Sequence, residues 1–212
     1  DGTHRHWVPM LGEQTPFFAS LLENPRFCNS AEQLYGEDVF GIITDANRYV
    51  GDTKWHPDTQ STHQYGIKFA FYLEPVGAKS GALRVIPGSH KQPFHGELRQ
   101  AREESRLDLA EVPAFVCESE PGDVVGFDLR LWHASLGGGV DRRMCTLVYY
   151  NNPKTDEEDQ VTRKQARSNA GTSTKFGRPP DPIHPPHWLA NPHKNPKRQR
   201  WINRMKELEF FG

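Results

Sequence analysis

The apolar residues near the start of the chain recur three and four positions apart, which is the spacing of an amphipathic helix. Those residues are Phe17, Phe18, Leu21 and Leu22. The preceding pair Thr15-Pro16 is typical of a helix N-terminus, and a second helix is predicted over residues 29–35, before Gly36. Residues 39–43 then form an unbroken apolar run, which predicts a first buried strand.

From residue 65 onward, large apolar residues occupy alternate positions, as in a strand with one buried face. This alternation extends over residues 65–74, and further strand-like runs follow at 82–86, 124–127 and 145–150. Turn residues separate the runs at Pro87-Gly88, Pro121-Gly122 and Gly137-Gly138-Gly139. Short strands at turn-marked intervals predict a mainly β fold, either a barrel or a jelly roll, with the two helices at its N-terminus.

Two segments depart from this pattern. Residues 90–112 carry many charges among scattered leucines and predict a solvated helical insert or a covering loop. Beyond residue 150 the chain becomes polar, and seven prolines from Pro179 to Pro196 predict an extended conformation rather than a helix or a paired strand. Residues 201–210 are expected to form a short amphipathic helix. Residues 151–212 would then be a Pro-rich tail packed on the barrel, with docking on a second subunit as the alternative.

The composition fits a single domain over residues 1–212, with a core from about 39 to 150, because 35% of the residues are apolar. A net charge of -1 gives no field that would attract nucleic acid or an anionic membrane surface. The apolar runs are far shorter than the ~20 residues of a spanning helix, so a soluble protein is expected. Its expected assembly is a monomer or a homodimer.

The three cysteines have no C-x-x-C spacing and cannot all pair, which indicates a reducing compartment, and a cytoplasmic location is expected. The chain opens at Asp1 rather than at a methionine, so it is expected to be an excerpt. Whether a targeting segment was removed before Asp1 is left open by the sequence.

One short motif and one later histidine carry the candidate chemistry. His56-Pro57-Asp58 places a histidine and a carboxylate two positions apart, on one face if the segment is a strand. His133 ends the strand-like run 124–132 and supplies a second histidine. Two histidines and one carboxylate are the ligand set of mononuclear non-haem iron(II) oxygenases, which leave positions open for a bidentate 2-oxo acid and for dioxygen.

Arg142 and Ser135 are the candidates for holding a dicarboxylate co-substrate. A hairpin turn centred on Gly138 would pair the strand that ends at Ser135 with one that starts at Arg142, so that both side chains lie on the side of His133. A guanidinium fork beside a hydroxyl is a favourable grip on a carboxylate. A slip of one residue in the strand register would place Arg143 on this face instead of Arg142. The apolar pattern does not decide between the two arginines.

These stretches resemble the phytanoyl-CoA dioxygenase-like iron(II)/2-oxoglutarate oxygenases. They cover about half of the chain in the family's order: Trp55-His56-Pro57-Asp58, Gly81-Ala82-Leu83-Arg84-Val85-Ile86-Pro87-Gly88-Ser89-His90, Pro121-Gly122-Asp123-Val124-Val125-Gly126-Phe127-Asp128, and His133-Ala134-Ser135 followed by Arg142. The resemblance implies a double-stranded β-helix, the cupin-like jelly roll, with iron on His56, Asp58 and His133. It also implies that Arg142 and Ser135 bind the distal carboxylate of 2-oxoglutarate. The loop before Arg142 is slightly shorter than in better-known members, which keeps Arg143 open.

The resemblance further implies an enzyme that uses iron(II), 2-oxoglutarate and dioxygen to hydroxylate an unactivated carbon of a small molecule, with succinate and carbon dioxide as co-products. Asp58 argues against a halogenase, in which a small residue replaces the carboxylate ligand. The alternative from another class is a non-catalytic, cupin-like module that binds a metal or a ligand, but such a module has no need of an arginine anchor. A zinc hydrolase would also leave Arg142 unexplained.

Several other residues are candidates for contacts with the co-substrate or the substrate. Lys68 and Tyr72 share a strand face, and either could touch 2-oxoglutarate, with outward solvation of Lys68 as the alternative. Trp55 and Trp132 flank metal ligands and are expected to wall the pocket or to pack in the core.

Four other polar residues each have two interpretations. His63 and Arg84 are substrate candidates, with simple exposure and a surface salt bridge as their alternatives, and Arg130 is a similar case. His90 is interpreted as part of a structural turn and is left out of the site. The tail histidines are expected on the surface; they are His184, His187 and His193.

Overall fold

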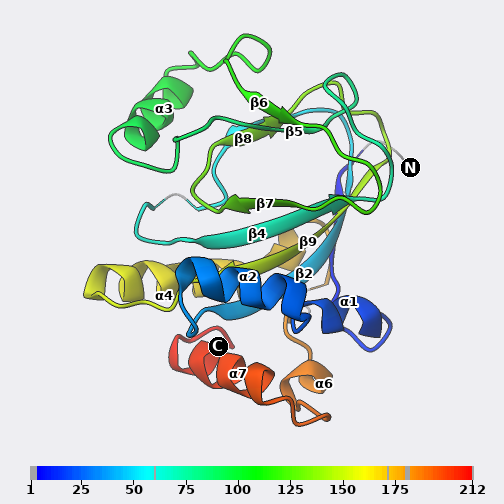
Figure 1. Ribbon diagram of the computed structural model, residues 1–212, viewed down its shortest axis with the longest axis vertical. Helices are drawn as coiled ribbons and strands as arrows, with labels where there is room; N and C mark the ends of the chain where they lie inside the picture. Colours follow the sequence, from blue (N-terminus) through cyan, green and yellow to red (C-terminus); the bar gives the residue numbers. More distant parts are fainter. Residues whose placement is uncertain (1–3, 60, 171, 180–181, 212) are drawn as a thin grey trace. The chain divides into compact units, whose positions relative to one another are not determined.

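Two β-sheets form the framework of the protein (Figure 1). The computed structural model describes residues 4–59, 61–170, 172–179 and 182–211. The larger sheet has the order β1-β2-β9-β4-β7, and its strands are, in that order, His6–Pro9, Phe40–Tyr49, Arg142–Tyr150, Gly66–Tyr72 and Val125–Asp128. The smaller sheet has the order β3-β8-β5-β6, with the strands Thr53–His56, His133–Ser135, Leu83–Val85 and Phe115–Cys117. The β framework expected from the alternating pattern is confirmed.

Helices precede, interrupt and follow the strands. The N-terminal helices α1 (Pro16–Leu21) and α2 (Pro25–Tyr35) are confirmed, although α2 begins earlier than the predicted residue 29. α3 (Phe94–Glu103) lies in the charged segment that was expected to be a helical insert. The helices after the last strand are α4 (Asp156–Ala170), α5 (Thr172–Lys175), α6 (Pro186–Leu189) and α7 (Pro196–Glu207). In the described part of the chain, no helix combines the length and the apolar character needed to cross a membrane.

The expectation that the proline-rich residues 179–196 exclude helices is wrong, whereas the helix expected over residues 201–210 is present as part of α7. α6 and α7 begin at Pro186 and Pro196, inside the segment that was expected to exclude helices. A proline is tolerated in the first turn of a helix, because an N–H there has no partner within the helix and the fixed φ of proline suits the helix. Pro186 and Pro196 therefore begin helices rather than break them.

β2 is also longer than predicted. The prediction followed an apolar run, whereas the second half of the strand is polar. The strand continues past residue 43 to Tyr49 and includes Asp45 and Asn47, which are buried. Thr146 Oγ1 in β9 donates a hydrogen bond of 3.0 Å to Asp45 Oδ2. A paired side chain of this kind lets a polar residue occupy a buried strand position that an apolar pattern does not reveal.

The described chain divides into two compact units. Of the described residues, unit 1 comprises those within 4–5, 47–65 and 69–145, and unit 2 comprises those within 6–46, 66–68 and 146–211. All five principal candidate residues belong to unit 1; they are His56, Asp58, His133, Ser135 and Arg142. The expectation of a single domain stays a prediction.

Unit 1 has one hydrophobic cluster on each face of the smaller sheet. The inner cluster joins residues of both sheets, among them Tyr72 of β4, Leu83 of β5 and Phe127 of β7. In β8, His133 and Ser135 are paired with Val85 and Leu83 of β5. Since directly paired residues share a face, both side chains lie on the face of Leu83 and the inner cluster.

The outer cluster covers the opposite face of the smaller sheet. It contains Trp55, Trp132 and Ala134, packed with Ile86 and with Leu98 of α3. Ala134 lies between His133 and Ser135 in β8, so the alternation of side chains along the strand separates this cluster from the candidate site.

Unit 2 joins the C-terminal helices to the N-terminal ones. Lys197 of α7 forms an ion pair of 2.7 Å with Glu32 of α2. The ring of Phe210 packs edge-on against Phe40 of β2, at 6.1 Å between centroids. His184, expected on the surface, is instead buried, where its Nε2 lies 2.7 Å from the carbonyl oxygen of Ile42, within hydrogen-bond distance. The other two tail histidines are exposed as expected; they are His187 and His193.

Candidate metal and co-substrate site

The two candidate histidines meet because β3 and β8 are neighbours in the smaller sheet. His56, the last residue of β3, is paired with His133, the first residue of β8, and Thr53 is paired with Ser135. Between these two pairs β3 has one more residue than β8, which is a bulge. The imidazole rings lie 4.4 Å apart between centroids. A bulge re-aims side chains at the end of a ladder, and here it accompanies the approach of the two rings.

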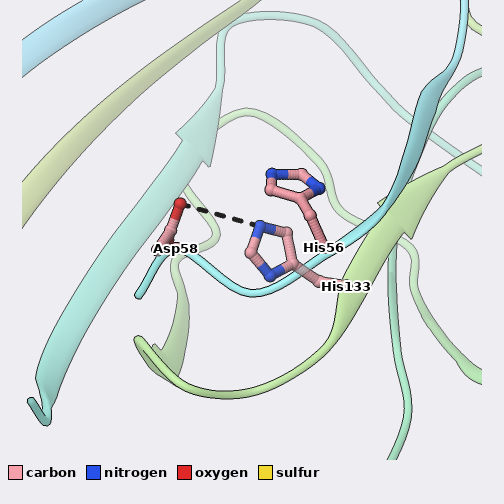
Figure 2. Close-up of side chains that lie close together, drawn as sticks. All are labelled: His56, Asp58 and His133. Carbon is pink, nitrogen blue, oxygen red and sulfur yellow. Dashed lines mark ion pairs between the residues drawn. The ribbon is translucent and has the colours of Figure 1, made fainter. Parts of the chain in front are cut away.

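Asp58 joins the histidines from beyond the end of β3. The expectation that His56 and Asp58 point to one face of a common strand is wrong, because the strand ends at His56. The backbone N–H of Asp58 donates instead to the carbonyl oxygen of Leu129, at 2.9 Å. Its Oδ1 lies 3.9 Å from Nε2 of His133. Figure 2 draws this pair as a dashed line. One ligand atom from each of the three residues falls within 4.8 Å of the others.

Backbone carbonyl groups orient both imidazole rings. Nδ1 of His56 lies 2.7 Å from the oxygen of Lys54, and Nδ1 of His133 lies 2.9 Å from the oxygen of Leu131. A carbonyl oxygen only accepts hydrogen bonds, so each Nδ1 carries a proton, and in the neutral ring Nε2 then has the lone pair that a metal needs. Two imidazole nitrogens and one carboxylate then form the donor set that suits mononuclear iron(II).

Arg142 brings a buried positive charge to the same region. Its side chain is 5% exposed, and Nη2 donates a hydrogen bond of 2.9 Å to Oγ of Ser135. Nε and Nη1 are buried and make no hydrogen bond to any described residue. Its guanidinium carbon lies 5.0 Å from the centre of the Tyr49 ring. A buried cation with two unused donors fits the carboxylate of a bound acid.

Two glycines make room for this guanidinium. A Cβ atom on Gly81 or on Gly138 would overlap Nη1 of Arg142. Gly81 also has φ +88°, a conformation that favours glycine. The N–H of Gly138 donates to Oδ1 of Asp52 at 3.3 Å, and that of Gly137 does so at 2.7 Å, so Asp52 holds the glycine loop. In the sequence, Gly138 is interpreted as a turn residue and Gly81 belongs to a stretch shared with the family, and neither pattern indicates the approach to Arg142.

Arg142 and Arg143 have opposite environments. The side chain of Arg143 is 54% exposed and forms an ion pair of 3.3 Å with Glu74, while Arg142 is buried beside Ser135. The hairpin expected between the strands of Ser135 and Arg142 is wrong, because β8 belongs to the smaller sheet and β9 to the larger one. The two residues nevertheless meet, across the two sheets.

Tyr49 lies beside the guanidinium, Tyr72 is buried in the inner cluster, and Lys68 belongs to unit 2. Tyr72 is buried in the inner cluster, and burial raises the pKa of its hydroxyl while the charge of Arg142 acts in the opposite direction. Tyr49 was missed by the sequence analysis, because it ends the polar half of β2, beyond the apolar run. Lys68 is partly buried in β4, and its contact with a co-substrate stays a prediction.

The four substrate candidates lie elsewhere in unit 1. Trp55 and Trp132 are 2% and 0% exposed in the outer cluster, which is the core-packing alternative for them. Arg84 is paired with Ala134 on the outer face and donates to the carbonyl oxygen of Ala78 at 2.8 Å. Its expected contact with substrate therefore has no support in its orientation. His63 is exposed in the loop after Asp58, which agrees with simple exposure as the alternative to substrate contact.

Comparison with known proteins agrees with this geometry. The phytanoyl-CoA dioxygenase (PhyH) family matches residues 2–144. The chain belongs to this family. Members are iron- and 2-oxoglutarate-dependent dioxygenases, so the family expected from the sequence is confirmed. The ectoine dioxygenase of Sphingopyxis alaskensis is 26% identical over 166 residues, which are 64% of this chain and 54% of that protein.

Solved structures agree on the fold. The S. alaskensis EctD structure with 2-oxoglutarate and 5-hydroxyectoine has a TM-score of 0.53 at 23% identity, over 70% of this chain and 58% of EctD. The epimerase SnoN from nogalamycin biosynthesis has a TM-score of 0.55 at 19% identity, over 72% of this chain and 64% of SnoN. These likenesses confirm the double-stranded β-helix. The chain spans about half or less of the curated relatives that it matches, at 54% and 30% of their lengths.

Proposed function

We propose that the protein hydroxylates an unactivated carbon of a small molecule, with iron(II), 2-oxoglutarate and dioxygen, and releases succinate and carbon dioxide. The observation that carries this proposal is the buried guanidinium of Arg142, which has two unused donors and is bonded to Ser135. Ser135 is two residues from His133 on the same face of β8. A binding module that holds only a metal has no use for a buried cation beside it.

Three side chains would hold the iron, namely Nε2 of His56, a carboxylate oxygen of Asp58 and Nε2 of His133. When bound, the iron and 2-oxoglutarate supply the oxidising chemistry, which side chains cannot provide. Arg142 and Ser135 would bind the distal carboxylate of 2-oxoglutarate and so fix the end of the co-substrate that does not react. Because Arg142 is buried, this grip would be stronger than the same contact in water.

The relatives support the co-substrate and leave the substrate open. The EctD structure contains 2-oxoglutarate together with 5-hydroxyectoine, a small hydroxylated molecule. A second SnoN structure is a complex with Fe3+, alpha ketoglutarate and nogalamycin RO. We therefore expect a small-molecule substrate here, and its identity is to be found by screening.

The proposal is tested with the purified chain under anaerobic conditions. Iron(II) and 2-oxoglutarate are added, oxygen is admitted, and succinate is measured with and without each candidate substrate. We expect succinate that depends on both additions and that rises with the right substrate. Binding of iron and 2-oxoglutarate without any succinate across a broad metabolite library would favour the non-catalytic binding module. A chain that binds neither would end the proposal.

Two further expectations stay predictions. Cys28, Cys117 and Cys145 are free thiols, which suits the reducing cytoplasm expected from the sequence. A monomer or a homodimer is the expected assembly, to be measured by sedimentation or light scattering.

A further inference from the structure

We propose that Arg130 is a positioning residue for the iron ligands, and that it acts through the backbone of residues 128–132. This inference rests on the proposed function, since it concerns the same metal site. It starts from a two-pronged ion pair. Nε and Nη2 of Arg130 donate to Oδ1 and Oδ2 of Asp128 at 2.9 and 2.7 Å. The two side chains are only 19% and 16% exposed, so the pair is largely shielded from water.

The residues on either side of Arg130 hold two of the metal ligands. The carbonyl oxygen of Leu129 accepts from the backbone N–H of Asp58 at 2.9 Å. The carbonyl oxygen of Leu131 lies 2.9 Å from Nδ1 of His133. A shift of this short segment would therefore move the Asp58 backbone and release the His133 ring together. Neither carbonyl can be replaced by mutation, so the side chain that fixes the segment is the one to examine.

Asp128 closes the segment into a turn that Arg130 completes. The N–H of Leu131 donates to the Asp128 carbonyl at 2.9 Å, and the N–H of Arg130 donates to Asp128 Oδ1 at 2.8 Å. The carboxylate of Asp128 thus receives the backbone and the side chain of the same arginine. Three donors on one carboxylate leave the turn few alternative conformations, which orients the carbonyls of Leu129 and Leu131.

The same guanidinium also reaches the loop that follows Asp58. Nη1 of Arg130 donates to the carbonyl oxygen of Thr62 at 3.3 Å. Its guanidinium carbon lies 4.8 Å from the centre of the Tyr65 ring. Arg130 therefore links the segment before His133 to the segment after Asp58, and a lysine could not make these contacts at once, because it lacks the planar fork.

The Pro87-Gly88-Ser89-His90 turn supports the segment at its other end. Oγ of Ser89 accepts from the backbone N–H of Trp132 at 2.9 Å, and Ser89 is fully buried. The carbonyl oxygen of Ser89 lies 3.1 Å from Nδ1 of His95 in α3. This motif, which provides no metal ligand, thus has a structural role beside the residue that precedes His133.

The test measures metal affinity and fold separately. The metal-free full chain is titrated with cobalt(II), whose visible absorption reports its coordination, in the wild type, Arg130→Ala, Arg130→Lys and Asp128→Asn. Arg106→Ala is the matched control, because Arg106 and its partner Glu104 are 59% and 45% exposed. We expect a loss of cobalt affinity of about 10- to 100-fold in Arg130→Ala and Asp128→Asn, a smaller loss in Arg130→Lys, and none in Arg106→Ala.

Thermal unfolding of the metal-free proteins distinguishes positioning from general instability. We expect the variants to unfold within a few degrees of the wild type, because Arg130 lies outside both hydrophobic clusters of unit 1. Wild-type affinity in a folded Arg130→Ala would overturn the inference and leave the proposed function intact. If Arg130→Ala does not fold, the same comparison is made with Arg130→Lys and Asp128→Asn. A wild type that binds no cobalt or iron would overturn both proposals.

Discussion

Arg142 donates a hydrogen bond of 2.9 Å to Ser135 even though the two residues belong to different sheets. The bond connects the start of β9 with the end of β8, on the face that also carries His133. A buried guanidinium costs several kcal/mol when it has no counter-charge. Neither Asp nor Glu is paired with Arg142 among the described residues, so the co-substrate carboxylate is the counter-charge we expect.

Replacing Arg142 should weaken 2-oxoglutarate binding far more than replacing Arg143. Each hydrogen bond to a charged group contributes roughly 1.5–3 kcal/mol, so Arg142→Ala should raise the Kd of 2-oxoglutarate about 100-fold. Arg143→Ala should leave it within about twofold, because an exposed ion pair contributes little. Calorimetric titration of the iron-loaded proteins under nitrogen measures both values. The opposite ranking would assign the anchor to Arg143.

A methyl group on Gly81 or Gly138 should have a similar effect without removing any charge. In Gly138→Ala the new Cβ would overlap both the Arg142 guanidinium and the backbone carbonyl of Gly51, and we expect the guanidinium to be displaced from Ser135. We expect the KM for 2-oxoglutarate to rise at least about tenfold, with a smaller change in kcat. Gly139→Ala is the matched control, since a Cβ there meets nothing within 4 Å. Equal KM values for the two variants would argue against the glycine cradle.

Loss of one metal ligand should abolish metal binding while the fold persists. His56→Ala should lower iron(II) affinity by at least about 100-fold, because two protein ligands remain where three are needed. His63→Ala, at an exposed histidine of the following loop, should bind iron like the wild type. In thermal scans, added iron should raise the unfolding temperature of the wild type and of His63→Ala, but not of His56→Ala. A stabilised His56→Ala would place the metal elsewhere.

Acid should destabilise the protein through His184. Burial lowers the pKa of this imidazole to about 4, so the folded state favours the neutral ring. Its contribution is fully present above the ordinary pKa of about 6.5 and is lost as the pH falls toward 4, by up to about 3 kcal/mol. His184→Gln should flatten this part of the stability curve. His187→Gln, at an exposed histidine, should not. Urea unfolding at several pH values measures the difference.

The candidate metal ligands could be named from the sequence because they stand in short, ordered motifs. His56-Pro57-Asp58, a later histidine and a following arginine were sufficient to propose a ligand set and to name the family. The local geometry around these residues was predicted less well. Asp58 lies beyond the end of β3 rather than within it. The strands that carry Ser135 and Arg142 were expected to pair as a hairpin, but they belong to different sheets. Strand alternation and turn rules describe neighbours in sequence, and these contacts join distant segments.

Two features of the C-terminal segment could not be foreseen for a related reason. They are the helix starts at Pro186 and Pro196 and the burial of His184. A proline inside a helix breaks it, whereas a proline in its first turn is tolerated, and composition does not distinguish the two positions. His184 lies among prolines in the sequence, but packing against Trp188 and the Ile42 carbonyl removes it from water. Burial of a polar side chain depends on the partner that satisfies it.

The residue types and their order therefore carried the chemistry: the ligand set, the arginine and the family could be inferred from the chain alone. The choice of Arg142 as the buried arginine, the positions of Gly81 and Gly138 around it, and the contacts of Arg130 with the segments beside the candidate ligands emerged only with the folded chain. The reason is that ligand identity depends on side-chain chemistry, whereas burial and partnership depend on which distant strands and loops come together in space.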